Sequence, residues 1–259
     1  MIKQSKRLLA TLLTTLLACT LQAAFAAEET REVDSFSRVA FSLPFEVQFV
    51  PSSSPYVTLE GDGDVIEDII TEVDGDTLRI KQKERWLDLS SWSDDEVIVT
   101  VGFDKLEDIT MSGSGDGYAE ELSSDHLRLT ISGSASLELG ECNADEVEVS
   151  IAGSGDVEIS TLEAGSVRTR VAGSGNIKLE GRAVTQVISI AGSGDHEAPE
   201  LKTQETKARI SGSGDILVWA QAKLDATIMG SGDIEYYGDA NVSERVMGSG
   251  SITRLGDSP

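Results

Sequence analysis

The chain has 259 residues, of which 45 are acidic and 21 are basic, so its formal net charge is −24 at pH 7. A surface this acidic repels nucleic acid and anionic lipid head groups, and we therefore expect no nucleic-acid partner. Only two cysteines are present, Cys19 and Cys142, so stability must come from packing rather than from a disulfide framework.

The N-terminus has the layout of a secretory signal. Three cations precede an apolar run over residues 8–17, which is too short to span a bilayer, and Ala24-Phe25-Ala26 fits the pattern of a cleavage site. We therefore predict a signal peptide over residues 1–26 and a bacterial-type protein exported to the periplasm or the cell surface. No transmembrane segment is expected in the mature chain.

A second interpretation of the leader is a lipoprotein signal. Leu16-Leu17-Ala18-Cys19 resembles a lipobox, in which Cys19 would become the lipidated first residue. Both interpretations export the protein. Cleavage after Ala26 would leave Cys142 alone, and a lone thiol is more often a small buried hydrophobe than a reactive group.

Residues 27–108 are predicted to form a β-rich region that lacks the repeat found after it. Apolar and polar side chains alternate from Phe41 to Phe49, which predicts one strand with a buried face. Asp64 is a candidate N-cap for a short helix over residues 65–72. Further strands are expected over residues 56–60, 77–81 and 96–101, with a turn at residues 74–76.

Two tryptophans, Trp86 and Trp92, lie between the last two of these predicted strands. An exposed pair of indoles can stack on a sugar ring or on a partner surface, which makes both residues candidate contacts. Large aromatic side chains are usually buried for the most part, so we favour a role in covering the open end of the core.

From residue 109 onward the sequence repeats with a period near 20. Gly-Ser-Gly-Asp or a variant occurs eight times, and successive first glycines are separated by 20, 20, 20, 19, 20, 18 and 18 residues. The residue two positions before the first glycine is apolar in all eight units, and apolar alternation resumes after the motif. Each unit therefore reads as a strand, a glycine turn and a second strand. The first glycines are Gly113, Gly133, Gly153, Gly173, Gly192, Gly212, Gly230 and Gly248.

Units of this length cannot bury an apolar face alone, so consecutive units must stack. We predict an all-β protein in which residues 109–259 form a right-handed parallel β-helix-like solenoid of about eight coils, each of about 20 residues. Helical repeats are a poor alternative, because no unit has a 3.6-residue apolar pattern and every unit has glycine in its middle.

The motif suits a corner between strands. Glycine permits positive φ and close approach of neighbouring coils, and the serine found at the second position in every unit is expected to hydrogen-bond along the column. The fourth position is Asp five times, Asn once and Ser twice, all residues that bond the backbone of turns. We favour a structural role for the motif.

The fourth position also offers a candidate metal site. Asp195, Asp215 and Asp233 come from consecutive units, and carboxylates about 4.8 Å apart would repel one another unless a cation lay between them. The calcium-binding nonapeptide solenoid has similar residues but places ligands from adjacent half-turns around one ion, which a period near 20 does not. We therefore expect weak or no calcium affinity and no other cofactor.

The tandem Gly-Ser-Gly-Asp/Asn-Ile/Val units, behind an exported leader and a β region ending near residues 77–80, resemble the putative auto-transporter adhesin head GIN domain family. The similarity covers about Val33 to Leu255, and Gly175-Asn176-Ile177 is one clear instance of the pattern. The resemblance implies a right-handed β-helix-like fold, export to the periplasm or cell surface, and an adhesive role. It implies no catalytic or binding residues.

Patterns typical of catalysis are few. His126 and His196 are the only histidines, so one chain cannot form a histidine metal cluster. Ser124-Asp125-His126 suggests a triad, but adjacent residues on a strand point to opposite faces. His196 replaces the Val or Ile that usually follows the motif, which predicts a bulged connection there.

We therefore predict a non-enzymatic, adhesin-like or scaffold module that binds a surface polymer such as a glycan, or an envelope protein. One alternative is a carbohydrate-active enzyme, a lyase or hydrolase, on the same fold, with a groove lined by outward residues. Another is a self-associating envelope protein, a homo-oligomer, because solenoid ends expose unpaired strand edges. The outward candidates for the groove are Arg168, Arg170, Lys178 and Arg209.

Overall fold

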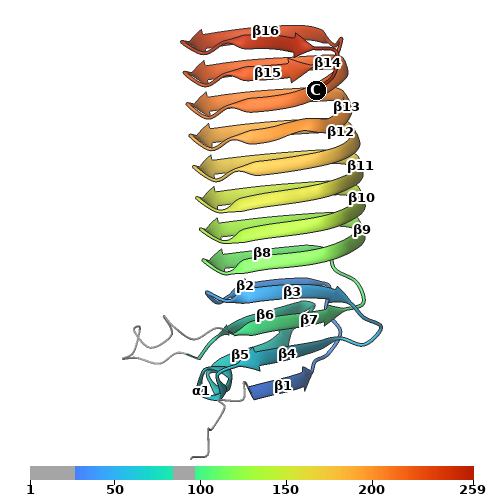
Figure 1. The fold of residues 1–259 in the computed structure, drawn as a ribbon, viewed down its shortest axis with the longest axis vertical. Coiled ribbons are helices and arrows are strands. Elements are labelled where there is room, and N and C mark those ends of the chain that lie inside the picture. Colours follow the sequence, from blue (N-terminus) through green and yellow to red (C-terminus); the bar gives the residue numbers. More distant parts are fainter. Residues whose placement is uncertain (1–26, 84–96) are drawn as a thin grey trace, which may run out of the picture.

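The computed structural model describes residues 27–83 and 97–259. They form a tall stack of β-coils with a smaller β-rich base (Figure 1). The predicted signal peptide, Cys19, Trp86 and Trp92 lie outside the described residues. Among the described residues, no helix is long and apolar enough to cross a membrane.

The repeat region is an all-β solenoid of about seven turns, close to the eight coils predicted. Each long strand pairs in parallel with the strands of the preceding and following coils, as in Leu137↔Val157 and Val157↔Ile177. The strands are β8 (Asp108–Gly113), β9 (Asp116–Gly133), β10 (Ser136–Gly153), β11 (Asp156–Gly173), β12 (Ile177–Gly192), β13 (His196–Gly212), β14 (Ile216–Gly230), β15 (Ile234–Tyr237), β16 (Asn241–Gly248) and β17 (Ile252–Gly256).

Each long strand runs around the coil from one glycine corner to the next. In β10, Gly140 and Asp145 have no pairing partner in β11. The alternation of buried and outward side chains shifts by one residue at each of these two positions, so that Leu139, Cys142 and Val147 are all buried. We call the segments that end at the glycine corners the pre-corner face. They are β8, β16 and the parts of β9 to β14 that begin at residues 126, 146, 166, 185, 205 and 223.

The glycine corners are held by backbone bonds between coils. The first glycine of every unit has positive φ. The N–H of the following serine donates to the carbonyl of the first glycine one coil below, at 2.8–2.9 Å in all seven steps. The serine hydroxyls were expected to bond along the column, but no such bond joins them within residues 113–251 of the structure. The backbone amide of each serine makes the inter-coil contact instead.

The alternating segment from Phe41 to Phe49 is two strands, not the single strand predicted. β2 (Arg38–Ser42) and β3 (Glu46–Pro51) are separated by a bend that contains Pro44, which has no N–H for a ladder. β2 pairs in parallel with β8, and β3 pairs in parallel with β9. This segment therefore adds one coil to the stack without any glycine motif.

The base continues the parallel pairing for one more layer and then turns antiparallel. β6 (Thr77–Gln82) pairs with β2, and β7 (Ile98–Phe103) pairs with β3, both in parallel. Antiparallel partners complete the base: β5 (Ile69–Asp74) on β6, β4 (Tyr56–Gly61) on β7, and β1 (Ala27–Glu32) on β4.

The predicted helix over residues 65–72 is wrong in its extent and its cap. Helix α1 spans only Gly63–Glu67, and its N-cap is Asp62, whose carboxylate accepts the N–H groups of Asp64 and Val65 at 2.9 and 3.3 Å. Residues 69–74 form β5 because they pair with β6 through the predicted turn, where Gly75 has φ +66°. The β-branched run Ile69-Ile70-Thr71 suits that strand better than a helix.

Candidate functional site

From Asp156 to Ser251, the fourth positions of the corner motifs form a hydrogen-bonded column. The first two units are outside it, and the Asp156 N–H donates to the Ala135 carbonyl instead. The side-chain Oδ1 of each residue accepts the backbone N–H of the same position in the next coil. The bonds measure 2.8 Å to Asn176, 3.1 Å to Asp195, 2.8 Å to Asp215, 2.7 Å to Asp233 and 2.6 Å to Ser251. At the end of the column, the Ser251 hydroxyl and amide lower the pKa of Asp233.

The three candidate metal residues Asp195, Asp215 and Asp233 are therefore neighbours in this column, as the spacing predicted. Each supplies an acceptor to a backbone amide, which explains their side chains without an ion. In residues 27–83 and 97–259 no group of three His, Cys, Asp or Glu side chains is placed to hold a metal ion. Weak or absent calcium affinity stays a prediction.

The column predicts different effects for two substitutions of Asp215. Asp215→Ala removes the acceptor for the Asp233 N–H, 2.7 Å away, and should lower the free energy of unfolding by about 1 kcal/mol. Asp215→Asn keeps an Oδ1 acceptor, as Asn176 does for the Asp195 N–H, and should cost clearly less. Urea unfolding of both variants compares them, and equal losses would contradict a role as hydrogen-bond acceptor.

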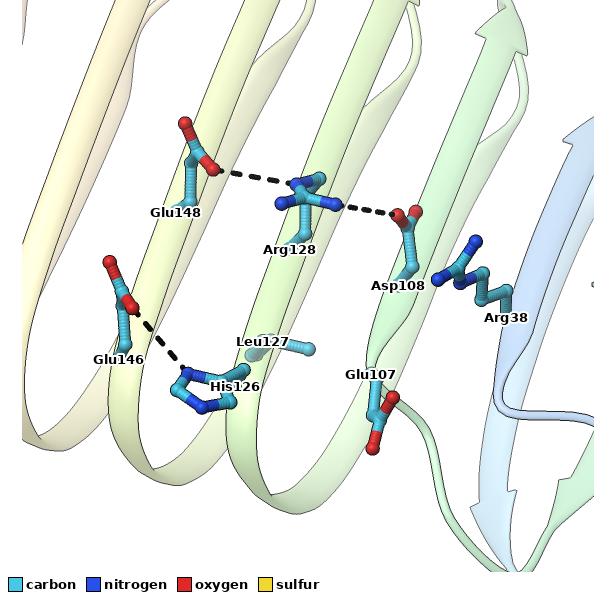
Figure 2. A pocket seen from close by; sticks show the side chains of 8 residues that line it. All are labelled: Arg38, Glu107, Asp108, His126, Leu127, Arg128, Glu146 and Glu148. Carbon is cyan, nitrogen blue, oxygen red and sulfur yellow. Dashed lines mark hydrogen bonds and ion pairs between the residues drawn. The ribbon is translucent and has the colours of Figure 1, made fainter.

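A second candidate site lies on the pre-corner face, where a small hollow of about 170 Å³ is lined by charged side chains (Figure 2). Arg128 lies between two acids on neighbouring coils, 3.6 Å from Asp108 and 3.4 Å from Glu148. Arg170 reaches the other oxygen of Glu148 at 2.6 Å. Because cations and acids alternate from coil to coil, the charges at this end of the face compensate one another in ion pairs.

His126 belongs to the same hollow but not to a triad. Its Nδ1 lies 3.5 Å from Glu146, on the next coil, as Figure 2 shows. The Ser124 hydroxyl donates instead to the backbone carbonyl of His126 at 3.0 Å. Ser124 and the imidazole are therefore not arranged as nucleophile and base.

His196 is buried in the core, and the irregular connection predicted beside it begins one to two residues later. It pairs in register with Ile177 and Ile216, and the register shifts after Glu197 in the pairing with β12 and after Ala198 in the pairing with β14. Its Nε2 lies 2.8 Å from the Nε2 of buried Gln186, and full burial lowers the pKa of His196 to about 3. The His196 Nδ1 and the Gln186 Oε1 are buried without a hydrogen-bond partner among the described residues. Sequence reasoning did not single out Gln186.

The remaining cysteine behaves as predicted for a lone thiol. Cys142 is fully buried between Leu122 and Leu162 of the neighbouring coils. Burial raises the pKa of its thiol to about 12. Its packing therefore explains its presence without any chemistry.

These features define a class: a β-solenoid with polar hydrogen-bonded corners and a long, regular, charged sheet face. The model of the family described as putative auto-transporter adhesin, head GIN domain, matches residues 35–240, and the chain belongs to this family. A comparison with curated proteins finds no match.

Solved structures share the fold. A protein from Parabacteroides merdae described as a putative adhesin aligns with a TM-score of 0.84 and 22% identity, over 90% of this chain and 97% of that one. A protein from Parabacteroides distasonis described as a putative lipid binding protein aligns with a TM-score of 0.82 and 24% identity, over 90% and 98%. At these identities the likeness concerns the fold.

Proposed function

We propose that the protein is an exported, non-enzymatic, adhesin-like or scaffold module that binds a surface polymer or an envelope protein along its solenoid, in the periplasm or on the cell surface. The observation that carries this proposal is the pre-corner face. It presents eight parallel segments in register, from β8 to β16, whose outward side chains repeat about every 4.8 Å. Membership in an adhesin family supports the same function.

A preformed sheet face suits binding of an extended ligand. Every coil is fixed by ladder bonds and by the serine N–H bonds at its corner, so little conformational entropy would be lost in the protein when a ligand docks. The repeat along the stack would offer similar contacts to successive units of a polymer. A repetitive ligand could thus gain affinity from several weak contacts at once.

The last coil argues against end-to-end stacking of two copies. Glu244 and Arg254 are exposed at this edge, in register with buried Ala226 and Tyr236, and Val246, two residues after Glu244, is 42% exposed. Charged side chains at an edge disfavour the addition of another strand layer. Light scattering should therefore report a monomer.

A glycan array probed with the exported protein tests the proposed function, with mass analysis of any glycan that binds. Retention of a glycan without cleavage is the expected result. Release of shortened chains would favour the carbohydrate-active enzyme instead. If no glycan binds, the proposal requires that the protein bind an envelope protein. Capture of one defined envelope protein, repeated with the two purified proteins, would show this.

A further inference from the structure

Charge is distributed unevenly over the solenoid. Residues 108–259 include 11 Lys and Arg and 25 Asp and Glu. The pre-corner face holds seven of these cations but only six of the acids, which leaves four cations and 19 acids on all other surfaces. The seven cations are Arg128, Arg168, Arg170, Lys207, Arg209, Lys223 and Arg245.

The two ends of this face differ in how the cations are used. Near the base, Arg128, Arg168 and Arg170 all form ion pairs with acids of neighbouring coils. In the last three coils Lys223 pairs with Asp225 at 3.2 Å. Lys207, Arg209 and Arg245 form no ion pair with any residue that the structure describes, although acids are abundant in this chain. These three exposed cations form what we call the cationic groove.

The register places the groove residues in neighbouring rows. Arg209 and Arg245 face the same direction two coils apart, with Thr227 between them, so their backbones are about 9.6 Å apart. Lys207 lies two residues before Arg209 on the same strand. The next row holds Met229 and Met247, which are 38% and 52% exposed. The resulting open groove has a volume of about 480 Å³. Two acids also line it, Asp225, which pairs in register with Lys207, and Glu244, so the cations exceed the acids by one.

We propose that the cationic groove binds a linear anionic polysaccharide through the carboxylates of its sugar acids. This inference rests on the proposed function and names the ligand class for it. Guanidinium groups bind carboxylates through paired hydrogen bonds, and the methionine side chains supply soft apolar surface for the carbon–hydrogen faces of sugar rings.

Charge spacing favours this ligand over nucleic acid. A nucleic-acid strand carries one phosphate about every 3.4 Å. For each phosphate that contacts an arginine, further phosphates would lie near the acidic side chains on the rest of the solenoid and would be repelled by them. A polymer of alternating acidic and neutral sugars carries its carboxylates much farther apart, on a scale closer to the arginine spacing of about 9.6 Å. Its neutral sugars would lie over Thr227 and the methionines.

Calorimetric titration with hyaluronan fragments tests the inference. Hyaluronan carries a carboxylate on every second sugar, and neutral dextran is the comparison. The wild-type protein should bind hyaluronan and not dextran, and added salt should weaken the binding. Arg209→Gln with Arg245→Gln should weaken it at least about tenfold. The matched control is Lys178→Gln with Arg182→Gln, which removes the same charge from exposed sites elsewhere and should change affinity less than about twofold.

Each other outcome has a defined meaning. Undiminished hyaluronan binding by the Arg209/Arg245 variant, or equal weakening by both double variants, would overturn the cationic groove. Binding of neutral glycans or of an envelope protein without hyaluronan would overturn this inference and leave the proposed function standing. Failure to bind any glycan or protein would overturn both. Thermal unfolding of all variants confirms that the compared proteins are folded.

Discussion

Replacing Gly212 with alanine should destabilise the solenoid by about 3 kcal/mol or more, the largest effect that we expect from a single methyl group. Gly212 has φ +152°, and a Cβ there would lie 2.0 Å from the carbonyl oxygen of Gly192 in the coil below. That oxygen cannot move freely, because it accepts the Ser213 N–H at 2.9 Å. The melting temperature measured by circular dichroism should fall by about 10 °C.

Gly63→Ala is the matched control for this prediction. Gly63 lies in the first turn of α1, and its added Cβ would meet only the Ala27 side chain at an ordinary 3.6 Å. The melting temperature of this variant should stay within about 2 °C of wild type. Equal behaviour of the two alanine variants would show that close approach of the coils does not require glycine.

The His196→Ile variant should lose part of the acid sensitivity of the wild-type protein. Burial lowers the pKa of His196 to about 3, whereas an unfolded chain has a histidine pKa near 6.5, so the unfolded state binds the proton first. The His196 contribution to stability is therefore complete above about pH 6.5. It falls by about 1.4 kcal/mol per pH unit as the pH drops toward 3.

Isoleucine is the natural replacement because Ile177 and Ile216 occupy the paired positions in adjacent coils. The variant leaves Gln186 without its partner, which should lower stability near pH 7. Relative to wild type it should then recover about 2 kcal/mol by pH 5. Urea unfolding at several pH values measures the difference, and carboxylate effects common to both proteins cancel.

Parallel curves for wild type and His196→Ile between pH 7 and pH 5 would be inconsistent with a buried, neutral imidazole. Such a result would place His196 in contact with water.

The pairing of the repeat units followed from the sequence because it depends on local features that recur. The apolar residues two positions before each first glycine, such as Ile131 and Ile151, lie over one another in register. A one-residue shift would turn each of them to the solvent face. The same periodic pattern therefore specifies the strand, the corner and the neighbour in the next coil.

The candidate sites were less accessible to sequence reasoning. Aligning the units placed Asp195, Asp215 and Asp233 in one column, but the hydrogen bonds to the next coil's amides became visible only with the corner geometry. Arg209 was noted as an outward residue. Arg245 occupies the same position two units later, three residues before a first glycine, but the absence of ion pairs at both residues among the described residues depends on how the side chains lie in the structure.

The sequence by itself determined the all-β class, the period and the glycine corners, because strand alternation and positive φ are local properties of the chain. Only the tertiary structure decided that β2 and β3 add a coil without the motif, and that residues 69–74 form a strand rather than a helix. It also decided which cations lie beside acids and which do not. These outcomes depend on contacts between segments far apart in the chain, and local propensity does not encode them.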